Sequence, residues 1–225
     1  SQLTVRHVSN GPEALQPIDD RWAFLGGFPR WSSRENCLYW VDRLAPAVYR
    51  YTAEGTEKIF RPEHPVIGME LTADGQFIAL EHEYLFISEG RVRNRGKWGF
   101  GVPTCICSDP QGRIWAAIRM GSGQWKVGEV HRDGTLASHW QFNEAITALS
   151  WHPQRAQLFA LATESGTVFR LDASSQVRRF ATLPKGSGLL SGLAVDEQGN
   201  VWTALSDGWS IVKFDCDGNI EQMLG

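Results

Sequence analysis

The chain alternates short runs of apolar residues with polar turns, and this arrangement recurs five times along its length. Each repeat has an apolar strand, a polar turn that usually holds Asp or Gly, a second strand with a bulky residue, and a third strand that ends on another turn. Such a pattern is typical of short antiparallel strands. The five repeats cover residues 29–55, 69–90, 105–134, 149–175 and 193–218.

The bulky position in the second strand sets the period of the repeat. Its occupants are 39, 37, 44 and 43 residues apart by subtraction, and they are Tyr39, Ile78, Trp115, Phe159 and Trp202. A four-stranded propeller blade has a period of about 40 to 50 residues. Blades stacked radially bury both faces of each sheet, which a lone sheet cannot do. The sequence therefore predicts an all-β fold, a β-propeller rather than a β-sandwich, formed by residues 1–225 as a single domain.

Five blades are recognisable in the sequence and a sixth is not. The segment 3–11 has the length of one or two strands, which is too short for a whole blade. The ring is thus either five-bladed, or six-bladed with a piece missing or supplied by another copy. The turns TADG, DPQG, DEQG and DCDG predict tight hairpins in which Gly takes a positive φ. We find no convincing pattern of a long helix.

Composition narrows the class of protein. The net charge is −3 and no Lys/Arg cluster occurs, which argues against a nucleic-acid surface. No apolar run approaches the ~18 to 20 residues that span a bilayer. The four cysteines are too few for a disulfide scaffold, so we expect buried thiols in a reducing cytoplasm. We expect a cytoplasmic protein with a small-molecule ligand and neither a nucleic-acid nor a membrane partner, and we leave self-association open.

Four motifs resemble those of the senescence marker protein (regucalcin), gluconolactonase and luciferin-regenerating enzyme family. They are LGGFPRWSSRENCLYWVD, similar to LGEGPxW…LYWVD; SDPQGRIWAAI, similar to VDPxGRxWxGT; ITALSWHPQRAQLFAL, similar to ISNGLxWSPDxxxLYxxD; and LLSGLAVDEQGNVWTAL, similar to LPDGLAVDxxGNLWVAL. The last is the most specific. The resemblance covers nearly the whole chain up to about residue 220, and the four motifs are persuasive as a set.

The resemblance implies a six-bladed propeller that hydrolyses sugar lactones with one divalent metal at the end of its central channel. Members of the family hold this metal with a Glu, an Asn and an Asp from different blades, and the corresponding positions here are Gly27, Thr147 and Ser191. The positions of the substrate-holding Arg and Asn become Val102 and Thr104. We therefore predict a divergent member that has lost the metal site and needs no cofactor, because a divalent cation usually requires at least one carboxylate.

Other polar and aromatic residues offer replacement chemistry. Glu70 is expected at the start of the second blade's inner strand, where it serves as an acid or base in the channel or, the favoured alternative, points to a solvated channel mouth or forms an ion pair. Phe28 adds apolar surface beside the missing carboxylate, and Trp98 and Phe100, in the basic and aromatic segment 93–101, form either a flap over the mouth or a plain inter-blade loop.

Two further groups of residues are weaker candidates. Cys105 and Cys107 share one strand face, and a nucleophilic pair of either thiol with His152 is the less favoured alternative to buried, inert cysteines. Glu81, His82 and Glu83 lie at a hairpin, where neighbouring residues alternate faces, so we expect a solvated turn in preference to a metal site.

Three functions remain compatible with the sequence. The first is a gluconolactonase-like propeller without its metal that binds or transforms a small molecule in the channel. The second is a rebuilt site that acts as a lactonase, another hydrolase, or an acid–base cyclase or isomerase, with Glu70 as the first choice of catalytic group. The third is a protein-interaction propeller that uses its rim. Whether the chain is an enzyme is left open at this stage.

Overall fold

The computed structural model describes residues 30–224, apart from residues 33, 43–46, 100, 175, 185, 187 and 206–209. Twenty strands form five antiparallel four-stranded sheets within this part of the chain, and each sheet contains four strands that follow one another in sequence. The predicted all-β propeller is therefore confirmed. Among the residues described, no helix is long and apolar enough to cross a membrane.

Each sheet is one blade. The first blade comprises β1 (Arg30–Ser32), β2 (Cys37–Asp42), β3 (Ala47–Thr52) and β4 (Gly55–Phe60). The second comprises β5 (Val66–Leu71), β6 (Gln76–Leu80), β7 (Glu83–Ser88) and β8 (Arg91–Lys97). The third comprises β9 (Val102–Ser108), β10 (Ile114–Arg119), β11 (Trp125–Val130) and β12 (Leu136–Phe142).

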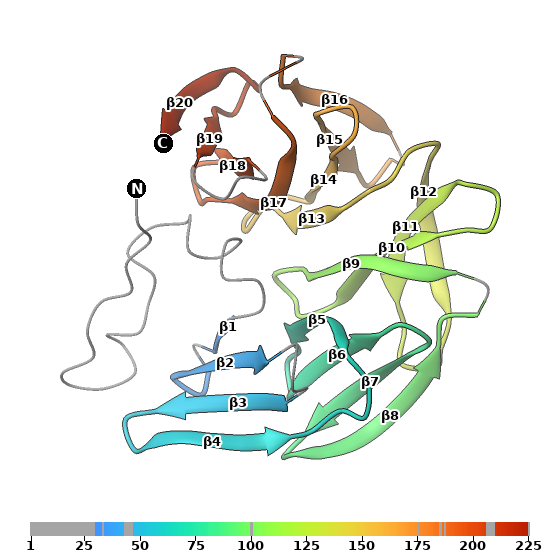
Figure 1. The fold of residues 1–225 in the computed structure, drawn as a ribbon, viewed down its shortest axis with the longest axis vertical. Helices are drawn as coiled ribbons and strands as arrows, with labels where there is room; N and C mark the ends of the chain where they lie inside the picture. The colour runs from blue at the N-terminus through green and yellow to red at the C-terminus, as the bar shows by residue number, and fades with distance from the viewer. Residues whose placement is uncertain are drawn as a thin grey trace.

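The last two blades follow the same plan. The fourth comprises β13 (Ala148–Trp151), β14 (Gln157–Ala162), β15 (Thr167–Asp172) and β16 (Val177–Thr182). The fifth comprises β17 (Leu190–Val195), β18 (Val201–Leu205), β19 (Ile211–Phe214) and β20 (Ile220–Leu224). The first strands of successive blades, β1, β5, β9, β13 and β17, contact one another in that order and form the inner wall (Figure 1). Because every inner strand runs in the same sense, the starts of these strands meet at one end of the fold.

The core consists of four apolar clusters, one between each pair of successive blades. The cluster between the first and second blades includes Tyr39, Met69 and Ile78, and the next contains Phe77 and Tyr84 packed on the third blade. The two remaining clusters lie between the third and fourth blades and between the fourth and fifth blades. Each blade from the second to the fourth thus buries both faces, which is the reason given above for radial stacking.

The predicted bulky positions all lie in the second strands, as the period required. Tyr39, Ile78, Trp115 and Phe159 are buried. Trp202 in β18 is half-buried, and the ammonium group of Lys213 lies 5.1 Å from the centre of its ring. The periodic bulky positions therefore mark the inter-blade core in the first four repeats, whereas Trp202 lies outside the buried clusters.

A shared hydrogen-bond arrangement, here called the Asp–Trp turn, holds the first two strands of two blades together. In the third blade, Asp109 Oδ1 accepts the backbone N–H groups of Gln111 and Arg113, both at 2.9 Å. Its Oδ2 accepts Trp115 Nε1–H at 3.0 Å and Arg113 Nε–H at 2.6 Å. The carboxylate thereby joins the turn to the aromatic residue of the core.

The fifth blade repeats this arrangement and the fourth varies it. Asp196 Oδ2 accepts Trp202 Nε1–H at 3.0 Å; burial raises the pKa of Asp196, but hydrogen bonds from Trp202 and Asn200 outweigh it and the pKa is lowered. In the fourth blade, His152 Nδ1 accepts the N–H groups of Gln154 and Arg155 at 3.0 and 3.1 Å. Burial lowers the pKa of His152, and a neutral imidazole leaves Nδ1 able to accept.

The turn glycines follow the prediction at three of the four sites. Gly112, Gly199 and Gly218 have φ values of 80°, 82° and 83°. Gly75 in the turn TADG does not have a positive φ, and a Cβ there would lie 1.9 Å from the backbone oxygen of Ile87. Close approach of two backbones therefore explains this glycine, and the expectation of a positive φ was wrong at this position.

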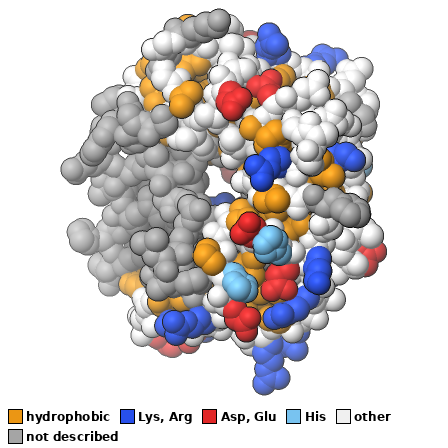
Figure 2. Space-filling model, turned by 45° about the vertical axis from the view of Figure 1, so that its right-hand side comes forward, with side chains coloured by type: hydrophobic (Ala, Val, Ile, Leu, Met, Phe, Trp, Pro, Cys, Tyr) orange, Lys and Arg blue, Asp and Glu red, His pale blue; other side chains and the backbone are white. Residues whose placement is uncertain are grey.

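The surface carries charges of both signs. On the face shown in Figure 2, acidic and basic side chains are interspersed among hydrophobic ones, and neither sign forms a continuous patch there. This distribution agrees with the small net charge of −3.

We predict that Asp109→Ala lowers the free energy of unfolding by about 3 to 4 kcal/mol, because it removes four hydrogen bonds and leaves a buried indole N–H unpaired. Urea denaturation followed by tryptophan fluorescence measures this change. Asp217→Ala, at an exposed turn position in the fifth blade, is the control and should change stability by less than about 0.5 kcal/mol. Equal effects of the two substitutions would contradict the importance of the Asp–Trp turn.

Candidate functional site

Four predicted site positions lie at the starts of neighbouring inner strands, and together they define what we call the channel mouth. Val102 begins β9 and Thr104 is two residues further along it, Thr147 directly precedes β13, and Ser191 is the second residue of β17. Val102 and Thr104 are half-buried, whereas Thr147 and Ser191 are exposed. The parallel course of the inner strands thus brings these four positions to one end of the channel. Gly27, Phe28 and Phe100 lie outside the described residues.

The hydroxyl groups of the mouth are largely engaged with the backbone. Thr104 Oγ1 donates to the carbonyl oxygen of Ile146 at 2.7 Å, which links the third blade to the fourth. Thr147 Oγ1 lies 3.3 Å from the carbonyl oxygen of Leu161 and is hydrogen-bonded to the hydroxyl of Thr163. Two of the three neutral hydroxyls therefore already have protein partners.

A pocket of about 930 Å³, here called the mouth pocket, opens beside Val102. It lies between the second and third blades at the β4–β5 loop, the β6–β7 turn and the β8–β9 loop. Its floor is apolar and includes Pro65, Val66, Ile67, Leu80 and Val102, whereas its rim carries His64, Glu81, His82, Glu83 and Lys97. An apolar floor with a polar rim is the usual construction of a small-molecule site.

Trp98 forms a fixed wall of the mouth pocket. Its Nε1–H donates to the carbonyl oxygen of Leu80 at 2.8 Å, and its ring centre lies 4.8 Å from that of Tyr84. These contacts hold the indole between the second and third blades. The sequence interpretations of the segment 93–101 were a flap and an inter-blade loop, but residues 93–97 belong to the strand β8, and Trp98 follows that strand in the β8–β9 connection.

Glu70 lies away from the mouth. It is the fifth residue of β5, so its expected place at the start of that strand was wrong: the strand begins at Val66, directly after Pro65. Ser108, which hydrogen-bonds to Glu70, is six residues along β9 from Val102. Six residues of strand span about 20 Å. The structure therefore separates Glu70 from the ligand positions that the sequence suggested.

The Glu70 carboxylate joins three blades. It accepts two hydrogen bonds from Arg30 of β1, Nε to Oε2 at 3.1 Å and Nη2 to Oε1 at 2.8 Å, and a third from Ser108 Oγ to Oε2 at 3.1 Å. Glu70 is 4% exposed. Burial by itself lowers the pKa of Arg30, but the charge and hydrogen bonds of Glu70 outweigh it and the pKa is raised. This is the ion-pair alternative for Glu70, in a two-point geometry with charge-assisted hydrogen bonds.

A family model described as the SMP-30/gluconolactonase/LRE-like region matches residues 25–224. The chain belongs to this family.

Characterised relatives of this family member include lactonases. It is 27% identical over 212 residues to pentonolactonase XacC of Haloferax volcanii, a match that covers 86% of this chain and 71% of the relative. It is also 27% identical over 231 residues to a 6-deoxy-6-sulfogluconolactonase of Pseudomonas putida, with 92% and 77% covered.

Solved structures share the same fold. A calcium-binding regucalcin from Agrobacterium tumefaciens aligns with a TM-score of 0.68 at 14% identity and covers 88% of this chain and 72% of that one. A gluconolactonase from Xanthomonas campestris aligns with a TM-score of 0.64 at 19% identity, with 88% and 74% covered. At these identities the alignments show the fold alone.

The two weaker candidate sites in this family member, the cysteines with His152 and the β6–β7 turn, do not have the geometry of a reactive group. Burial raises the pKa of Cys105 to about 12 and the pKa of Cys107 well above its ordinary value, which disfavours a thiolate. His152 Nδ1 accepts backbone N–H groups in its own turn. At the β6–β7 turn, His82 Nε2 lies 3.9 Å from Glu81 Oε1, and both side chains are exposed. Within the described ranges, no three His, Cys, Asp or Glu residues are grouped to hold a metal ion.

Sequence reasoning missed Arg30 and Ser108, the partners of Glu70. They are 40 and 38 residues from it along the chain. No local motif marks such contacts, since they arise only when three inner strands are placed side by side.

We predict that Arg30→Met and Glu70→Gln each lower the free energy of unfolding by about 2 to 3 kcal/mol, because each removes one charge of a mostly buried ion pair. This expectation is modest because 29% of the Arg30 side chain is exposed. Chemical denaturation of both single variants and the double variant gives the coupling energy.

The control for this cycle is the exposed pair of Arg132 and Asp74, whose side chains are 46% and 60% exposed. Its coupling should be about 1 kcal/mol or less. A coupling for Arg30 and Glu70 as small as that of the exposed pair would refute a structural role for the buried pair.

Proposed function

We propose that this family member holds a small lactone-like molecule with an apolar or aromatic face at the channel mouth, without a divalent metal. The observation that carries the proposal is the mouth pocket, whose apolar floor meets the channel mouth at Val102. We take the ligand class, a lactone, from the relatives, which are named as lactonases. The pocket supplies the preference for an apolar face.

The donor set at the mouth supports the absence of a metal. A hard divalent cation is usually bound by six or more oxygens that include carboxylates. Thr147 and Ser191 offer only neutral hydroxyls, and the hydroxyl of Thr147 is already hydrogen-bonded within the fourth blade. Such groups compensate poorly for the lost hydration of the ion. The residues described at the mouth therefore do not fit the divalent cation that the resemblance to the family implies.

The polarity of the pocket argues against a small sugar lactone as the preferred ligand. A hydroxyl group buried without a partner costs about 1 to 3 kcal/mol. The floor residues Val66, Ile67 and Leu80 have no side-chain hydrogen-bonding groups to offer to several sugar hydroxyls. A lactone fused to an aromatic ring avoids this cost and can lie against the fixed indole of Trp98.

Acid–base turnover by Glu70 is the second candidate, and the geometry favours it less. Both carboxylate oxygens are engaged by Arg30, and one of them also by Ser108. A carboxylate held in this way connects the inner strands. Proton transfer to Glu70 would have to break its ion pair with Arg30. We therefore propose a structural role for Glu70 and ligand binding as the function of the mouth.

We expect dihydrocoumarin, an aromatic lactone, to bind more tightly than glucono-δ-lactone, and we expect the latter to open at the uncatalysed rate with or without added calcium or zinc. Val102→Asp places a charge in the apolar floor and should weaken dihydrocoumarin binding about tenfold, or 1.4 kcal/mol. Titration calorimetry and a pH-stat assay of lactone opening measure the two effects.

The matched control is Val177→Asp, since Val177 in β16 is 41% exposed and lies outside the mouth pocket. It should bind dihydrocoumarin like the wild type. Metal-dependent turnover of glucono-δ-lactone, or unchanged binding in Val102→Asp, would overturn the proposal.

A further inference from the structure

A second pocket, of about 630 Å³, lies between the first and second blades. We call it the inter-blade pocket. It is built from the β1–β2, β5–β6 and β7–β8 turns together with β3 and β4. The mouth pocket uses the β4–β5, β6–β7 and β8–β9 connections instead. Since these turns lie at opposite ends of the strands, the inter-blade pocket is on the opposite face of the propeller from the channel mouth.

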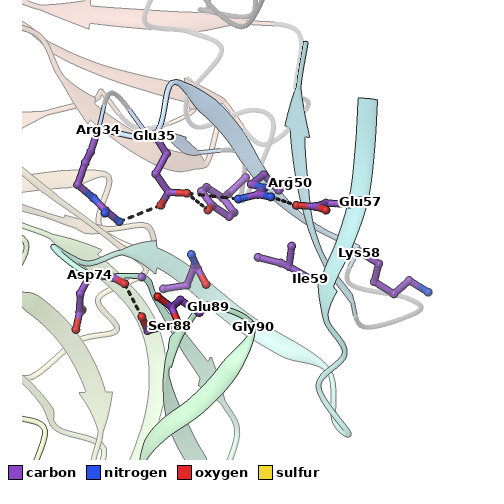
Figure 3. Close-up of a pocket in the computed structure, with 13 residues that line it drawn as sticks. Arg34, Glu35, Arg50, Glu57, Lys58, Ile59, Asp74, Ser88, Glu89 and Gly90 are labelled. Carbon is purple, nitrogen blue, oxygen red and sulfur yellow. Dashed lines mark hydrogen bonds and ion pairs between the residues drawn. The ribbon is translucent and has the colours of Figure 1, made fainter. Parts of the chain in front are cut away.

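One wall of the inter-blade pocket is a row of alternating charges from the first blade. Arg34 Nη2 pairs with Glu35 Oε1 at 2.9 Å, Arg50 Nη1 lies 3.7 Å from Glu35 Oε2, and Arg50 also pairs with Glu57. Tyr39 donates its hydroxyl proton to Glu35 Oε2 at 2.6 Å. Figure 3 shows this row along one side of the pocket. The charges of the wall are therefore largely compensated within the protein.

The second blade forms the facing wall. Figure 3 shows Asp74, Ser88 and Glu89 across the pocket from the charged row. Asp74 Oδ1 accepts a hydrogen bond from Arg132 Nη2 at 2.9 Å, and Ser88 Oγ donates to the backbone oxygen of Asp74 at 2.9 Å. In total, three basic and four acidic side chains line the pocket. A lining so nearly balanced gives little preference for either an anion or a cation.

Two buried polar groups of the pocket are left without partners. Gln76 is 4% exposed, and its Oε1 has no hydrogen-bond partner among the described residues. Arg50 Nε is likewise buried and unpaired in that part of the chain. Buried polar groups in folded proteins are almost always hydrogen-bonded, so such exceptions require an explanation. Here one group accepts and the other donates, and both belong to the lining of one pocket.

The unpaired groups define the chemistry of a matching ligand. A hydroxyl group can donate to Gln76 Oε1 and can also accept from Arg50 Nε. Neighbouring hydroxyls on one molecule also match the two oxygens of a carboxylate, which occurs on both walls, and the two terminal nitrogens of a guanidinium group, which occurs on the first-blade wall. A charged ligand gains little from walls whose charges are already paired. We propose that the inter-blade pocket is a binding site for an uncharged, hydroxyl-rich molecule of the sugar or polyol class.

The test uses the full chain and four probes of similar size: D-glucose and myo-inositol, which are neutral, and D-glucuronate and D-glucosamine, which are charged. We expect the neutral probes to bind with millimolar Kd and to shift the backbone amide signals of Gly75, Glu89 and Gly90 in two-dimensional NMR titrations. Gln76→Leu and Arg34→Ala should each raise Kd at least tenfold. Gln154→Leu, at an exposed turn of the fourth blade, is the control and should leave Kd unchanged.

Folding of the variants is checked by circular dichroism and thermal melting. The Arg34 side chain is 58% exposed, so its loss should not disturb the fold. Gln76→Leu removes a buried acceptor that has no partner and should melt at or above the wild-type temperature. Loss of sugar binding in a variant that melts normally supports the site. Absence of neutral-probe binding, tighter binding of either charged probe, or wild-type Kd values in both variants would overturn it.

Discussion

The structure depends on the need of each four-stranded sheet to bury two apolar faces. Radial stacking meets that need, and it places an aromatic or bulky aliphatic residue of every second strand in an inter-blade cluster. The Asp–Trp turns fix the geometry of those residues, because one carboxylate joins the turn backbone to the indole in the third and the fifth blades. The apolar packing between blades therefore uses side chains other than those of the mouth positions.

The residues at the channel mouth can therefore differ among propellers of this fold without disturbing the packing between blades. The mouth positions Val102, Thr104, Thr147 and Ser191 are exposed or half-buried and are not members of the buried core clusters. Thr104 even adds an inter-blade hydrogen bond, to Ile146. Deeper in the channel, Arg30, Glu70 and Ser108 connect three inner strands through charge-assisted hydrogen bonds. These three polar side chains therefore bond to one another, and their contacts hold neighbouring inner strands together.

The periodic features of the fold could be predicted from the sequence, and the long-range features could not. The spacing of Tyr39, Ile78 and Trp115 identified the blades, since burial against a neighbouring blade favours a bulky side chain at the same place in each repeat. The position of Glu70 was wrong because the repeats were aligned from Met69, whereas β5 starts at Val66. The unpaired amide of Gln76 is another such feature, because only the packing of the first blade on the second creates the inter-blade pocket.

This propeller has the family fold, and our central proposal is that it does not bind a divalent metal at its channel mouth. A ligand that binds only the native state must raise the melting temperature with its concentration, so thermal melting in increasing calcium or zinc tests the claim most directly. The account predicts an unchanged Tm from chelator-treated protein up to millimolar metal. A saturable rise of several degrees that is lost on adding chelator would contradict it.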